Sequence, residues 1–268
     1  MTKPSPSRNW SDLHSPDLKA DADQRIAVLP LAATEQHGPH LPLGTDVVIA
    51  RAYLDQVRTI LPAGIPALFL PIQPVGISTE HIAYPGTLTV PPELAIRTWM
   101  AIGESVARAG IRKLVMVSSH GGNSAAMGVV AQELRAHHGM LAVATGWSRF
   151  GAPEGLFCDD EIRHGVHGGA VETSIMLAAC PDQVRTDALG DFHPASVAMD
   201  KDYRRLSTRR PAPFAWQAQD LHPSGAVGNA AAASAENGRR LLAHGAQAFC
   251  ELLADVHRFD MAAFRNPT

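Results

Sequence analysis

The sequence lacks the charge pattern and the apolar runs that mark several common classes of protein. Its 268 residues carry 23 Lys and Arg against 26 Asp and Glu, a net charge of -3, with no long run of either sign. Nucleic acids and anionic membranes are therefore poor candidates for partners. No apolar stretch reaches transmembrane length, and the polar, proline-containing residues 1–20 lack the apolar core of a signal peptide. We expect a cytoplasmic protein that binds neither nucleic acid nor membrane.

Cysteine is scarce as well. Cys158, Cys180 and Cys250 lie far apart, and no C-x-x-C pair occurs. This pattern argues against a disulfide framework and against a thiolate metal site. We expect the three thiols to be reduced and mostly structural.

Three catalytic or binding motifs are also missing. The chain contains no P-loop and no G-x-G-x-x-G, so a phosphate cradle and a dinucleotide site are not expected. The tripeptide His120-Gly121-Gly122 resembles the oxyanion hole of an α/β-hydrolase, but that enzyme class also needs a G-x-S-x-G nucleophile elbow. No such pentapeptide occurs in the chain, which excludes the serine-hydrolase interpretation.

The sequence does contain several short apolar segments, each followed by a segment with apolar residues at helical spacing. Strands are expected at 26–33, 67–72, 113–118 and 140–145, and helices begin near 45, 92 and 124. This repetition predicts an α/β fold with a mostly parallel sheet flanked by helices on both faces, in one domain spanning residues 1–268. The segment 186–228 has no clear periodicity, and we expect it to form a lid or an oligomer arm.

A group of metal-type ligands follows the first expected strand. Glu35 and His37 are two residues apart, so an extended backbone points them the same way. Gly38 and two prolines then bend the chain, which lets Asp46 return toward that pair. Carboxylates and imidazoles suit zinc, manganese or iron. A polar turn is the commoner explanation for any one of these residues alone, but their density here favours a metal site.

Two His-Gly-Gly turns are expected near the same place. His120 follows the third strand, and His167 precedes a helix that carries Glu172. In parallel sheets, ligands gather at the carboxyl ends of the strands, so these residues can converge on the Glu35 segment. The alternatives are a capping histidine and a first-turn glutamate favoured by the helix dipole. We expect His40 and His81 to contact a ligand residue or the substrate.

These motifs together resemble the creatininase (creatinine amidohydrolase) family. The resemblance covers residues 35–46, 76–87, 120–123 and 167–174. It implies a three-layer α/β domain, two divalent ions (zinc or manganese most often, iron in some members) and a homo-oligomer, commonly a hexamer. It also implies roles for the site residues: Asp46 bridges the ions, Glu35 and His120 complete one site, His37 belongs to the other, and His167 is the acid or base.

The chain departs from creatininase itself in two places. Creatininase has Tyr-Glu directly after the histidine that matches His120, and that glutamate binds the second ion. Here Gly121-Gly122 leads to Asn123, so we expect Glu172 to complete the second site. Trp147 matches one tryptophan of the creatininase pocket, whereas Arg163 aligns with the other. An arginine there would favour an acidic amide over creatinine, unless Arg163 simply points to solvent.

The sequence therefore predicts a metal-dependent amidohydrolase that uses activated water to cleave a non-peptide or cyclic C–N amide bond of a small molecule. One alternative on the same site is a peptidase of the kind that trims the mycofactocin precursor, and another is a formamide deformylase. A non-catalytic metal-binding protein is the alternative from a different class. Substrate screening distinguishes the three enzyme activities from one another. Metal content measured together with turnover distinguishes an enzyme from a non-catalytic metal-binding protein.

Overall fold

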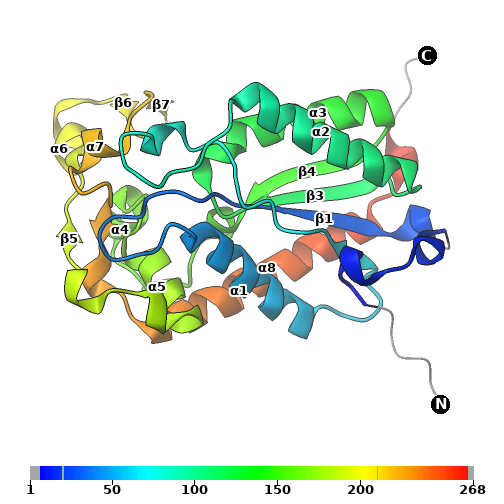
Figure 1. Ribbon diagram of the computed structural model, residues 1–268, viewed down its shortest axis with the longest axis horizontal. Helices are drawn as coiled ribbons and strands as arrows, with labels where there is room; N and C mark the ends of the chain where they lie inside the picture. Colours follow the sequence, from blue (N-terminus) through cyan, green and yellow to red (C-terminus); the bar gives the residue numbers. More distant parts are fainter. Residues whose placement is uncertain (1–6, 20, 210, 265–268) are drawn as a thin grey trace.

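The computed structural model describes residues 7–19, 21–209 and 211–264. Its centre is a parallel sheet in the order β2-β1-β3-β4. Figure 1 labels three of these strands, β1, β3 and β4. The strands are β1 (Ile26–Leu31), β2 (Ala67–Phe69), β3 (Lys113–Ser118) and β4 (Leu141–Gly146). All four were expected from the sequence, although β2 is shorter than predicted. Leu31 lies opposite Ser118, and Ser118 lies opposite Gly146, so three strands end level with one another.

Helices cover both faces of this sheet. On one face lie α2 (Pro92–Arg108) and α3 (Ser124–His138), and on the other lie α1 (Thr45–Ile60), α5 (Ala170–Ala179) and α8 (Ala235–Arg258) (Figure 1). Alternate residues of β1 face the two layers: Val28 packs toward α1 and α8, and Leu29 toward α2 and α3. The expected α/β architecture with helices on both faces is confirmed.

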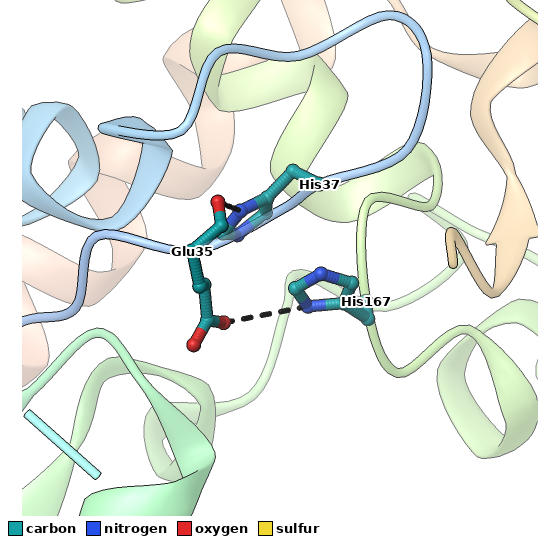
Figure 2. Close-up of side chains that lie close together, drawn as sticks. All are labelled: Glu35, His37 and His167. Atoms are coloured by element: carbon teal, nitrogen blue, oxygen red, sulfur yellow. Dashed lines mark hydrogen bonds and ion pairs between the residues drawn. The ribbon is translucent and has the colours of Figure 1, made fainter. Parts of the chain in front are cut away.

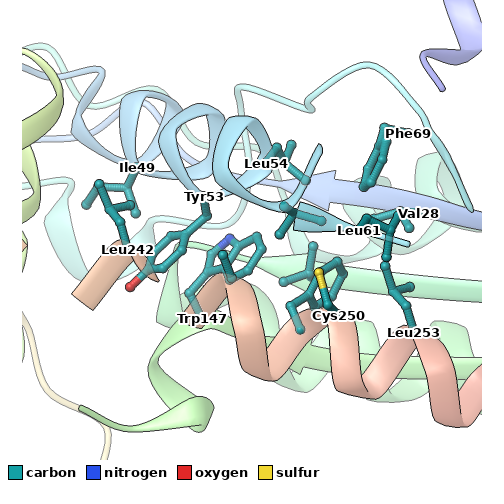
Figure 3. Close-up of a cluster of buried hydrophobic side chains, with 14 of the residues drawn as sticks. Val28, Ile49, Tyr53, Leu54, Leu61, Phe69, Trp147, Leu242, Cys250 and Leu253 are labelled. Carbon is teal, nitrogen blue, oxygen red and sulfur yellow. The ribbon is translucent and has the colours of Figure 1, made fainter. Parts of the chain in front are cut away.

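The larger hydrophobic cluster lies between the sheet and helices α1 and α8 (Figure 3). Leu54 of α1, Val28 of β1 and Leu253 of α8 are all essentially inaccessible to water. Every residue of β1 is buried, as is usual for a parallel strand covered on both faces. The carboxyl end of β1 is therefore a fixed support for the loop that follows it.

Short elements fill the chain between β4 and α8. They are α4 (Asp159–His164), β5 (Asp191–Phe192), α6 (Ala195–Asp202), β6 (Leu206–Ser207), β7 (Ala212–Pro213), α7 (Ala218–Leu221) and β8 (Gly228–Asn229). Strand β5 pairs with β8, and β6 pairs with β7. Most of this segment lies beyond the carboxyl ends of the sheet strands, at the left of Figure 1. Elements of two to eight residues carry too little periodicity to be found from the sequence.

In the part of the chain that the structure describes, no helix is both long and apolar enough to cross a membrane. The cytoplasmic location, the single-domain organisation and the homo-oligomeric state expected from the sequence stay predictions.

Candidate metal centre

The loop between β1 and α1 folds back on itself. The backbone N–H of Glu35 donates to the carbonyl of Leu43, with 2.9 Å between N and O, and His37 forms an isolated bridge with Leu41. This return brings Asp46, in the first turn of α1, back to the strand end. Glu35, His37 and Asp46 each expose 1% of their surface or less. Three ligand-type side chains are thus buried together, as the bend at Gly38 predicts.

Five side chains form two candidate metal sites that share one residue. Glu35, Asp46 and His120 offer one set of ligand atoms, and His37, Asp46 and Glu172 offer the other; within each set the atoms lie within 4.8 Å of one another. Asp46 is common to both sets. A third set combines Glu35, His37 and His167, whose side chains face one another in Figure 2. This His, Asp and Glu cluster is able to bind metal.

Backbone carbonyls orient all three imidazoles. Nδ1 of His37 lies 3.1 Å from the Glu35 carbonyl, Nε2 of His120 lies 2.7 Å from the Ile77 carbonyl, and Nε2 of His167 lies 2.6 Å from the Gln36 carbonyl. A carbonyl only accepts, so each of these nitrogens carries hydrogen and donates. The other nitrogen of each ring faces carboxylate oxygens. Metal-binding histidines are usually held in this way.

Several ligand atoms have no hydrogen-bond partner among the described residues. They are both carboxylate oxygens of Glu35, Nε2 of His37 and Oδ2 of Asp46, and all are buried. Nε2 of His37 lies 3.9 Å from Asp46 Oδ1 and 3.9 Å from Glu172 Oε2. Buried polar atoms without partners are costly unless a cation or a proton lies among them. The donor set therefore fits divalent ions.

Burial and mutual charge shift the pKa values of this cluster in opposite directions. Burial and the neighbouring charge of Glu35 raise the pKa of Asp46 well above its usual value. Burial alone would lower the pKa of His120, but the negative charge of Glu35, whose Oε1 lies 3.1 Å from Nδ1, outweighs it and raises that pKa to about 10. A bound metal ion would replace the Nδ1 proton of His120.

His167 differs from His120 in its proton affinity. Burial, with repulsion from His37, lowers the pKa of His167 to about 4, so its ring is neutral near pH 7. Its Nδ1 lies 3.8 Å from Glu35 Oε1 (Figure 2). A neutral ring whose Nε2–H is held by a carbonyl has a free lone pair on Nδ1. That atom can accept a proton or bind an ion.

A buried glutamate that the sequence analysis missed holds the turn that carries His167 and Glu172. Glu161 of α4 accepts the N–H of Ala170 at 2.6 Å and that of Asn229 at 2.8 Å. A Cβ built on Gly165 or on Gly169 would lie 2.3 Å from its carboxylate, which explains both glycines. No local sequence signal distinguishes this glutamate, because its partners are 9 and 68 residues away.

Four of the five candidate ligands, all except His37, line a cavity of about 250 Å³ together with further side chains that the sequence analysis did not select. Glu80 lies beside His120, with Oε1 3.5 Å from Nε2, and burial raises its pKa. The sequence signal that could have identified Glu80 is its place in a long loop, directly before His81. Arg209 and Trp216 reach the cavity from the 186–228 segment, and no pattern in the sequence indicates them.

Three other predicted residues support the ligands. His81 Nε2 lies 3.4 Å from Glu35 Oε1, and its ring stacks on His167. Asn123 is fully buried; its amide donates to the Ala32 carbonyl and its oxygen accepts from Ile77 N–H, joining the ends of β1 and the long loop. His40 does not face the cavity. Its Nε2 lies 3.0 Å from the hydroxyl of Thr173, the neighbour of Glu172.

Two expectations for substrate binding need correction. Trp147 lies in the hydrophobic core, 3% exposed, with its ring stacked on Tyr53 at 4.3 Å between centroids (Figure 3). The side chain of Arg163 is 69% exposed on α4 and pairs with Asp200 at 2.6 Å. Neither lines the cavity. Alignment to a family pocket placed them there, whereas the local chain path turns Trp147 inward and Arg163 outward.

The two glycines after His120 allow a matched test. A Cβ on Gly122 would lie 2.3 Å from the Ile77 carbonyl and 2.6 Å from Glu80, whereas a Cβ on Gly121 meets nothing within 4 Å. We expect Gly122→Ala to displace His120 and to weaken zinc binding at least tenfold, and Gly121→Ala to bind as wild type does. Equilibrium titration with a zinc indicator measures both. Equal affinities for the two variants would show that the close packing at Gly122 does not position His120.

A family model and several known proteins match this chain. The family model described as Creatininase: Creatinine amidohydrolase matches residues 11–253. The mycofactocin precursor peptide peptidase of Mycobacterium ulcerans (strain Agy99) is 33% identical over 221 residues, which cover 81% of this chain and 79% of the relative. The creatinine amidohydrolase of Pseudomonas putida is 28% identical over 243 residues, 84% of this chain and 87% of the relative.

Solved creatininase structures have the same fold. A manganese creatininase superposes with a TM-score of 0.76 at 24% identity, covering 95% of this chain and all of that one. A creatininase variant described as Zn-Zn type gives 0.74 at 25% identity with the same coverage. The family model spans nearly the whole described chain, and the motifs that carry the resemblance converge in the structure. The chain belongs to the creatininase family of hydrolases.

Proposed function

We propose that this protein is a metal-dependent amidohydrolase that cleaves a C–N amide bond of a small molecule by activated water. The observation that carries this proposal is the pair of ligand sets that share Asp46. A carboxylate common to two sites can hold two ions close together, as two-ion hydrolysis needs. Glu35 and His120 would complete the first site, and His37 and Glu172 the second.

The ligand chemistry supports zinc or manganese, with iron as a further candidate. Carboxylate and imidazole donors suit these ions, and no cysteine takes part in the ligand sets. The similar structures include a manganese and a Zn-Zn form. Divalent ions held here would polarise the amide carbonyl and lower the pKa of water from about 15.7 toward about 7.

The residues of the chain then supply the proton transfers. Nδ1 of neutral His167 would take a proton from the attacking water and give it to the leaving nitrogen, because its Nε2–H stays on the Gln36 carbonyl throughout. Gln36 also fixes His81, whose Nδ1 lies 2.7 Å from the Gln36 amide nitrogen. The ring of His167 contacts two other imidazoles: it is tilted against the ring of His37 and stacked on that of His81.

The cavity volume of about 250 Å³ favours a small or cyclic amide over an extended peptide. A peptidase is the second candidate function. This chain is 33–34% identical to mycofactocin precursor peptide peptidases but 28% identical to creatinine amidohydrolase, so the peptidase function needs its own test. Only the terminal residues of a peptide would fit this volume. A peptidase that trims a chain end is therefore compatible with the same site.

A substrate panel tests the proposed function. Protein loaded with zinc or manganese would be incubated with creatinine, formamides, N-acylated amino acids, carboxylated cyclic amides and short peptides. We expect turnover of at least one small amide that stops when a chelator removes the ions and returns when they are restored. Cleavage of peptides alone would support the peptidase instead. Stable metal binding with no turnover anywhere in the panel would contradict an enzymatic role on these bonds.

The shared ligand gives a second prediction. Asp46→Asn removes a charge from both ligand sets, so we expect the metal content to fall from two ions per chain to less than one. Asp55→Asn, an exposed change on the same helix, should keep both ions. Elemental analysis after dialysis measures the difference. Two tightly held ions in the Asp46 variant would rule out its bridging role.

A third prediction separates catalysis from metal binding at His167. We expect His167→Ala to retain its ions and to lose a factor of about 10² to 10⁴ in kcat, the usual contribution of general acid–base catalysis. Metal content and kcat would be measured on the same preparation. A loss below tenfold would remove His167 from the proton transfer, and a missing ion would assign it to the third ligand set instead.

A further inference from the structure

Arg209 stands out at the mouth of the metal cavity, where it keeps contact with solvent. Among the described residues that line this cavity, it is the only arginine or lysine, in a lining that also contains the carboxylates of Glu35, Asp46, Glu80 and Glu172. Trp216 lines the cavity beside it. Both come from the 186–228 segment rather than from the sheet or its helices.

Hydrogen bonds hold the two side chains in place. Strands β6 and β7 pair on either side of Arg209, and Phe214 N–H donates to the Ser207 carbonyl. The indole N–H of Trp216 donates to the Thr208 carbonyl at 3.3 Å. Nη1 of Arg209 donates to the Ile162 carbonyl at 3.0 Å, which fixes the guanidinium against the end of α4. Each of the two side chains is therefore oriented by a hydrogen bond to the backbone.

The guanidinium of Arg209 has no acidic partner in the described part of the chain. Its hydrogen bond is to a carbonyl, and partial burial lowers its pKa. Arg163, which directly follows Ile162 on α4, pairs instead with Asp200 at 2.6 Å. The charge of Arg163 is thus neutralised within the protein, whereas that of Arg209 is not.

In the described part of the chain no carboxylate pairs with the guanidinium of Arg209, so this group is available to an anionic group that enters the cavity.

We propose that Arg209 binds a carboxylate of the substrate and that Trp216 packs against the group that carries it. This inference rests on the proposed function and specifies its substrate class: an amide with a free carboxylate close to the bond that is cleaved. A guanidinium engages a carboxylate through two parallel hydrogen bonds, which an ammonium group cannot reproduce. The flat face of the indole offers apolar contact to the neighbouring part of the substrate.

Binding can be tested without turnover. Calorimetry on the zinc-loaded protein would compare N-acetylphenylalanine with its C-terminal carboxamide, which has nearly the same shape and no charge. We expect the wild type to bind the acid at least tenfold more tightly than the carboxamide. Arg209→Leu should reduce this preference at least tenfold, and Arg209→Lys should retain part of it. Arg163→Leu, which alters an exposed arginine of α4, is the matched control and should keep the full preference.

Trp216→Leu completes the set. It removes apolar contact but no charge, so we expect it to weaken the acid and the carboxamide by similar factors. Equal affinity of the wild type for both ligands, no measurable binding of the acid, or an equal effect of Arg163→Leu and Arg209→Leu would overturn the inference. Failure of the proposed function appears separately, as absence of turnover in the substrate panel while the Arg209-dependent preference in binding persists.

Discussion

Hydrogen bonds from three imidazoles to backbone carbonyls decide the chemistry of this site. The carbonyls of Glu35, Ile77 and Gln36 each accept from one ring nitrogen, so the opposite nitrogen must face the carboxylates. Two of these carbonyls belong to the loop after β1, which is anchored to a fully buried strand. The backbone thus sets the direction of all three rings, and the loop that supplies two of the carbonyls starts from the buried strand β1.

Small residues matter here because backbone and side chains approach closely. At Gly122 the space that a Cβ would occupy is already taken by the Ile77 carbonyl and Glu80. At Gly76 a Cβ would lie 2.4 Å from Asn123 Oδ1. Both glycines therefore let the long loop pack against the turn after β3, and this packing holds the Ile77 carbonyl that orients His120.

The sequence predicted the parts of the structure that depend on local patterns. Strand β1 and helix α1 follow from apolar periodicity, and the return of Asp46 follows from the bend between them. Glu161 and Arg209 could not be predicted in this way, because their roles depend on contacts with residues distant in the chain, such as Asn229 and Ile162. Arg163 was a plausible choice by position, but the neighbouring Asp200 on α6 holds it outside.

Glu161 links helix α5 to the segment that carries Arg209 and Trp216. One of its oxygens holds the first residue of α5, the helix of Glu172, and the other holds Asn229 at the end of the segment that carries Arg209 and Trp216. His167 and Val227 add a bridge between the same two parts. An outward movement of that segment at Asn229 would therefore pull on the helix that carries Glu172. The wall of the cavity that carries Arg209 and the wall that carries Glu172 are thus tied together through a single carboxylate.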